Sequence, residues 1–118
     1  MGRLGLLLLC SPVQHRSVET AVGLAEAAAR LGHSVSLFFL GDAVYATSRA
    51  LLSAPDETVV HRIAKLPPSV ERVNCSTCAR FRGLGDGDLI PRARNGTLED
   101  LVEILDTSDT FLSFTEEA

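Results

Sequence analysis

The apolar run at residues 4–9, Leu-Gly-Leu-Leu-Leu-Leu, is the feature that most restricts the fold of this chain. It has no polar side chain on either face, which is typical of a strand buried on both sides in a parallel sheet. The run is too short for the apolar core of a typical signal peptide. Leu9 also precedes Cys10 where a cleavage site would have small residues. We therefore predict a buried first strand.

Segments typical of helices and strands alternate through the rest of the chain. Apolar residues recur at helical spacing over residues 17–31, where Ser17 is the expected N-cap and Gly32 the stop. The other expected segments are a loop (10–15), a strand (33–40), a short helix (43–52), a helix capped by Asp56 and ending near residue 66, a strand (70–74), a helix (76–82), a weak strand (88–93), a helix (98–105) and a strand (110–114). This alternation predicts a single domain over residues 1–118, an α/β fold with helices on both faces of a mainly parallel sheet of four or five strands.

The composition restricts where the protein works and what it binds. The net charge is −4, with 46% hydrophobic and 22% charged residues, so we expect no nucleic-acid partner and no membrane partner. No apolar run is long enough to span a bilayer. The chain has three cysteines, which is an odd number and too few for a disulfide scaffold. These features predict a protein of the reducing cytoplasm.

Three predicted strands end in polar or reactive residues. Cys10 follows the first strand, Asp42 follows the second, and Cys75 with Ser76 follows the third. Ligands and chemistry gather at the carboxyl ends of parallel strands, so these four residues form the candidate site. Asp42 has the alternative role of capping the helix after it. Cys10 has the alternative role of a buried structural residue.

Cys75 lies where a predicted strand passes into a predicted helix, and unpaired backbone N–H groups at a helix start favour a thiolate. The alternative is an inert buried cysteine. Cys75 and Cys78 also form a C-x-x-C pair, the arrangement of redox dithiols, although the aromatic or proline neighbours of thioredoxin-like sites are absent. Arg82 lies about 10 Å from Cys75 along a helix axis. We therefore expect Arg82 to serve the helix C-terminus or a subunit contact.

Motifs for bound cofactors are missing from the sequence. Zinc needs four ligands, Cys75 and Cys78 supply two, and the histidines follow no ligand spacing. There is no G-x-S-x-G elbow, no G-x-G-x-x-G and no P-loop. We predict no metal site and no cofactor.

Three segments in order resemble the DsrE/DsrF-like family, which includes the TusD-type sulfur-relay proteins. Residues 32–45, Gly-His-Ser-Val-Ser-Leu-Phe-Phe-Leu-Gly-Asp-Ala-Val-Tyr, are similar to the family pattern G-h-x-V-x-L-F-F-x-x-D-G-V-Y. Cys75 precedes Arg82-Gly83 as in the family's C-x(6)-R-G element, and residues 98–114 resemble its closing helix and strand. Ala43 replaces the usual glycine, Phe81 replaces a common arginine, and Cys78 is an extra thiol.

The resemblance implies a three-layer α/β/α fold and a homotrimer or homohexamer, sometimes with paralogous subunits. It also implies a sulfur carrier or sulfurtransferase-like protein that accepts sulfane sulfur as a persulfide on Cys75 and passes it on. The implied partners are sulfur donor and acceptor proteins. Two alternatives stay open: a non-catalytic oligomeric binding protein of the same fold, and a thiol redox protein that uses Cys75 and Cys78.

Overall fold

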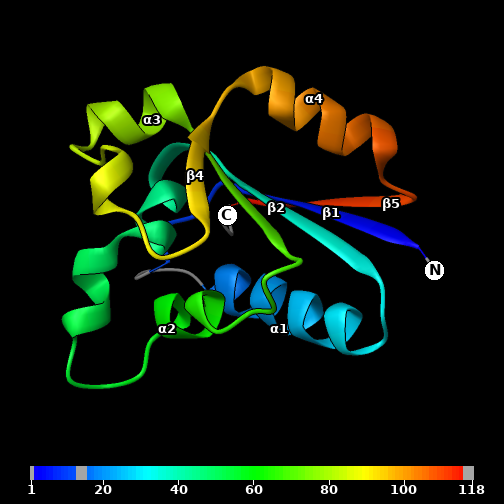
Figure 1. Cartoon of the computed structure of the whole chain (residues 1–118), viewed down its shortest axis with the longest axis horizontal. Helices are drawn as coiled ribbons and strands as arrows, with labels where there is room; N and C mark the ends of the chain where they lie inside the picture. Colours follow the sequence, from blue (N-terminus) through cyan, green and yellow to red (C-terminus); the bar gives the residue numbers. More distant parts are fainter. Residues whose placement is uncertain (1, 13–15, 116–118) are drawn as a thin grey trace.

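A single parallel sheet organises the chain (Figure 1). The computed structural model describes residues 2–12 and 16–115, so residues 13–15 of the predicted first loop lie outside the described residues. The strand order is β4-β3-β2-β1-β5, and every neighbouring pair is parallel. The strands are β1 (Arg3–Leu8), β2 (Ser34–Phe39), β3 (Glu71–Cys75), β4 (Ala93–Gly96) and β5 (Thr110–Phe114). The predicted α/β fold with a parallel sheet is confirmed.

Helices cover both faces of the sheet. In Figure 1, α1 (Arg16–Arg30) and α2 (Val59–Ala64) lie below the strands, and α4 (Leu98–Thr107) lies above them. α3 (Ser76–Phe81) begins where β3 ends. The predicted run at the N-terminus is β1, an interior strand between β2 and β5, whose Leu6 and Leu8 are fully buried against the α1 side.

The two faces have cores of very different size. The α1 face packs side chains from β1, β2, α1 and α2 into one large cluster. The α4 face has a smaller cluster made of Phe38, Val73, Cys75 and Ile104. We call them the large core and the small core.

Two predicted helix starts are wrong. Ser17 is not a cap, because it is the second residue of α1, where its hydroxyl donates to the sulfur of Cys10 at 3.1 Å. Asp56 does not cap α2. Thr58 does so, because its hydroxyl accepts from the Val60 N–H at 3.2 Å while its own N–H donates to the His61 ring.

The predicted helix over residues 43–52 and the predicted strand over 88–93 also differ from the structure. The first is two 3₁₀ helices, η1 (Gly41–Thr47) and η2 (Arg49–Ser53), because Ser48 between them is extended and bridges to Leu89. The second begins only at Ala93, as β4. Pro91 has no N–H to donate, and Arg92 has a left-handed φ of 70°, so regular pairing cannot start earlier.

Candidate functional site

Cys75 is the last residue of β3 and the N-cap of α3, so the predicted strand–helix junction is confirmed. Its backbone is extended, with φ −65° and ψ 115°, and its side chain makes no capping hydrogen bond. The residue is 6% exposed and belongs to the small core beside Phe38, Val73 and Ile104. A thiol in this place has the start of a helix on one side and apolar side chains on the other.

A second helix begins beside Cys75. In the β3–β4 register Cys75 is the partner of Gly96, and the next residue, Thr97, is the N-cap of α4. The N-termini of α3 and α4 therefore lie on adjacent strands at one edge of the sheet. Each helix start carries partial positive charge. At α4 the Asp100 carboxylate already accepts from the Thr97 N–H, so the free N–H groups that favour an anion at this edge are those of α3. The helix over residues 98–105 is predicted from the sequence, but the position of its start beside Cys75 is not, because that position depends on the pairing of β3 with β4.

Cys78 lies one turn into α3 and is half-buried. Its side chain packs against the small core that contains Cys75 and also against the large core. Ser76, the first residue of α3, is half-buried beside them. The structure thus brings Cys75, Ser76 and Cys78 together at the start of one helix.

Asp42 does not have the capping role that was the alternative to its place in the candidate site. Leu40 is the N-cap of η1, and the Asp42 carboxylate accepts from Nε of Arg82 at 2.9 Å. Nη1 of Arg82 also donates to the Cys78 carbonyl at 3.0 Å, which confirms the expected role of Arg82 at the helix C-terminus. The Asp42 carboxylate therefore ties η1 to the far end of α3. A surface pair of this kind contributes about 0–1 kcal/mol.

Cys10 is held apart from the other two cysteines. It is 0% exposed and belongs to the large core. Its sulfur accepts from the Ser17 hydroxyl at 3.1 Å, and its thiol donates to the Phe114 carbonyl at 3.6 Å. The structure does not bring Cys10 together with Cys75, and its surroundings are those of a structural cysteine.

Two buried polar side chains on β3 point to the opposite face from Cys75. Arg72 is 1% exposed and donates to the carbonyls of Ile63 and Val70, and burial lowers the pKa of its guanidinium. This arginine fastens the end of α2 to the sheet. Asn74 donates from Nδ2 to Thr47 and to Asn95, while its Oδ1 has no hydrogen-bond partner. Neither residue was expected to be buried, because polar residues in a strand usually face water.

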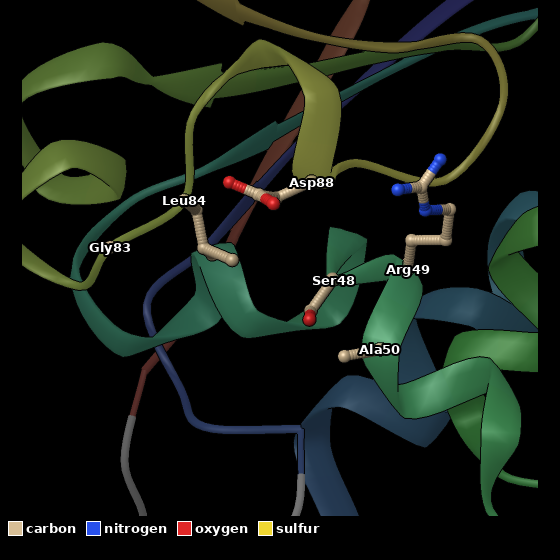
Figure 2. A pocket seen from close by; sticks show the side chains of 6 residues that line it. All are labelled: Ser48, Arg49, Ala50, Gly83, Leu84 and Asp88. Atoms are coloured by element: carbon tan, nitrogen blue, oxygen red, sulfur yellow. The ribbon is translucent and has the colours of Figure 1, made fainter.

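A cavity of about 340 Å³ lies beyond the far end of α3 (Figure 2). It is open to solvent and does not include Cys75. The residues that line it come from the η1–η2 junction and from the segment after α3, and they are Ser48, Arg49, Ala50, Gly83, Leu84 and Asp88. Its polar rim has one cation and one carboxylate, which suits a small polar ligand.

No group of metal-binding side chains occurs among residues 2–12 and 16–115. His15, one of the three histidines, lies outside these residues. Within the same described part of the chain, none of the helices has the length and apolarity needed to cross a membrane.

Comparison with known proteins agrees with the fold. The ychN protein from E. coli has a crystal structure that superposes with a TM-score of 0.87 at 25% identity, covering 97% of this chain and 100% of that one. MTH1491, a protein of unknown function from Methanobacterium thermoautotrophicum, superposes with a TM-score of 0.67 at 12% identity, covering 96% and 99%. No curated protein matches the sequence. The model of the DsrE/DsrF-like family matches residues 4–114. This chain therefore belongs to the DsrE/DsrF-like family.

Proposed function

We propose that this protein is a sulfur carrier that holds sulfane sulfur as a persulfide on Cys75. The observation that carries the proposal is the position of Cys75, which is the N-cap of α3 and the register partner of the residue before the N-cap of α4. Helix starts stabilise nearby anions by about 0.3–1 kcal/mol each. Membership of a family with sulfur-relay members supports the same assignment.

The chemistry needs only thiolate attack on sulfur. The Cys75 thiolate attacks the outer sulfur of a donor persulfide, R–S–SH, so the donor leaves as a thiol and Cys75–S–SH forms. An acceptor thiolate then attacks the outer sulfur of Cys75–S–SH and restores the Cys75 thiolate. Both steps exchange one S–S bond for another, so neither requires a metal or an organic cofactor.

The low exposure of Cys75 restricts which sulfur donors can reach its thiol. With 6% of the residue exposed, its sulfur is shielded by the small core and by the half-buried Leu40 and Leu101. Shielding protects a persulfide from bulk thiols. We expect a donor protein to deliver sulfur at the carboxyl edge of the sheet, and an acceptor protein to collect it there.

We further propose that the chain works as a homotrimer or homohexamer, or with paralogous subunits, in the cytoplasm. Support for assembly comes from α4, where Leu98, Val102 and Leu105 are 57%, 62% and 53% exposed. Their spacing places them along one side of the helix. An apolar stripe of this kind suits a subunit contact. Light scattering at micromolar concentration should give an oligomer, and a monomer would reject this part of the proposal.

Intact-mass analysis after treatment with a persulfide donor tests the carrier function. We use Cys78→Ser as the starting protein, because it leaves only Cys10 and Cys75. Cys78→Ser and the control Cys10→Ser/Cys78→Ser should each gain one sulfur atom, about 32 Da, whereas Cys75→Ser/Cys78→Ser should gain none. Loading that survives the loss of Cys75 would refute the assignment.

The cavity beside Arg49 and Asp88 favours a second candidate function, the binding of a small polar ligand without catalysis. The same mass experiment separates the two functions. If no cysteine gains sulfur in the folded protein, the binding function becomes the better assignment.

A further inference from the structure

The two cysteines of α3 occupy a special pair of positions. Cys75 is the N-cap, and Cys78 is the third residue of the helix. In a capping box each of these two side chains reaches the backbone N–H of the other residue, so both lie on the same side of the first turn. The inference below rests on the proposed persulfide at Cys75.

Two other helices of this protein show how close such side chains come. At the start of α2, the Thr58 hydroxyl lies 3.0 Å from Nδ1 of His61. At the start of α4, the Thr97 hydroxyl lies 3.5 Å from Oδ2 of Asp100. Both are N-cap and third-residue pairs. The thiols of Cys75 and Cys78 occupy the same two positions on α3.

The surroundings of the two thiols favour a reaction between them. Both are free, and both pack against the small core. Residues three apart on one helix face are neighbours, and a disulfide between the two cysteines needs their Cβ atoms to approach to about 3.5–4.5 Å. A persulfide on Cys75 would therefore form next to a second thiol inside the same shielded site.

We propose that Cys78 is a resolving thiol that releases the sulfur of Cys75–S–SH as hydrosulfide when no acceptor thiolate takes it. The Cys78 thiolate attacks the inner sulfur, which is the sulfur of Cys75. The bond between inner and outer sulfur breaks, and its electron pair leaves with the outer sulfur as HS⁻. The two thiols are oxidised to a Cys75–Cys78 disulfide, and the sulfane sulfur is reduced to sulfide, so atoms and electrons balance.

Turnover then requires a reductant of the dithiol class to reopen the disulfide. Cys78 is the more accessible of the two cysteines, since it is half-buried while Cys75 is buried. The reductant would attack at Cys78 and return both thiols. On this route the next reaction in the sequence would consume sulfide, whereas transfer to an acceptor thiol keeps the sulfur bound to protein.

The test treats the wild-type protein with glutathione persulfide under anaerobic conditions, traps hydrosulfide with monobromobimane, and follows intact mass. The wild type should lose about 2 Da as the disulfide forms and release about one equivalent of hydrosulfide above the buffer control. Cys78→Ser should instead keep the added sulfur and release none. Cys78→Ala repeats this test without a hydroxyl, and Cys10→Ser should behave as the wild type.

The outcomes distinguish a failure of the resolving role of Cys78 from a failure of the carrier function of Cys75. If the wild type keeps the added sulfur as Cys78→Ser does, the resolving role is overturned and the carrier function stands. If neither Cys78→Ser nor Cys78→Ala gains sulfur while the circular dichroism of both is native, the carrier function fails and the resolving role fails with it. Peptide mapping that places the disulfide on Cys10 also overturns the inference.

Discussion

The two faces of the sheet differ in how thickly they are covered, and each has a cysteine near the end of a strand. On the α1 face, Cys10 is sealed in the large core and hydrogen-bonded to Ser17. On the α4 face, Cys75 belongs to the small core and begins a helix. The same residue type is thus given structural surroundings on one face and surroundings suited to chemistry on the other.

This difference shows that two cysteines that follow strands of one sheet can have very different surroundings. Cys10 follows the first strand and lies in the large core, where Ser17 of α1 donates to its sulfur. The third strand leads directly into a helix with no intervening loop, so Cys75 itself is the cap. The cover over Cys75 is the small core under α4, which leaves 6% of the residue exposed.

The largest expected effect is a loss of unfolding free energy, and it should be greater for a truncation in the large core than for one in the small core. Leu37 is 0% exposed in the large core, and Leu37→Ala should cost about 2–5 kcal/mol of unfolding free energy. Ile104→Ala should cost less, near the lower end of that range, because α4 can shift inward to fill the space. Urea denaturation at one fixed protein concentration measures both. An equal loss of unfolding free energy for Ile104→Ala and Leu37→Ala would contradict the difference between the large core and the small core.

A smaller effect is expected at Gly5 on β1, where α4 approaches the sheet closely. A Cβ at this position would lie 2.5 Å from Oγ of Ser108 and 2.9 Å from Cγ2 of Ile104. Gly5→Ala should therefore cost about 1–3 kcal/mol by pushing α4 outward. The control is Gly87→Ala, where nothing lies within 4 Å, and its effect should stay within about 0.5 kcal/mol. Equal effects at the two glycines would show that α4 is not closely packed at β1.

The smallest effect concerns the start of α4. Asp100 accepts from Arg94 at 3.0 Å and from the Thr97 N–H at 2.8 Å, and these hydrogen bonds, Arg94 first, lower the pKa of its carboxyl. A carboxyl with a lowered folded pKa stabilises the protein above its unfolded pKa, near 3.8, and loses that contribution as pH falls through the folded pKa. Asp100→Asn should cost less than about 1 kcal/mol at pH 7.

Urea denaturation of Asp100→Asn and of the wild type at several pH values shows how the stabilisation by Asp100 changes with pH. The difference between them should shrink below pH 3.8. A difference that grows as pH falls would contradict the role of the ionised carboxylate at the helix start.

Most of the fold could be predicted from local patterns, and the exceptions have physical causes. The strands at 4–9, 33–40 and 110–114 show as apolar runs. The position of β4 is not visible as an apolar run, because its sequence Ala-Arg-Asn-Gly is polar and its start depends on the φ of Arg92. Its place beside β3 is set by long-range pairing, which no local pattern encodes.

The candidate site could be predicted only in part. The strand–helix junction at Cys75 is visible in the sequence, since Val73 is typical of a strand and Ser76 of a helix start. The adjacent start of α4 and the separation of Cys10 from Cys75 both follow from tertiary packing. So does the pairing of Asp42 with Arg82, which lie 40 residues apart.

The most direct test of the contrast between the two faces is the order in which the three native cysteines are alkylated. The folded protein is treated with a limiting amount of iodoacetamide across pH, and peptide mapping gives the rate at each cysteine. We predict that Cys75 reacts fastest, because it is the N-cap of α3, and that Cys10, which is 0% exposed, does not react until the protein unfolds. Faster alkylation of Cys10 or Cys78 than of Cys75 would contradict the account.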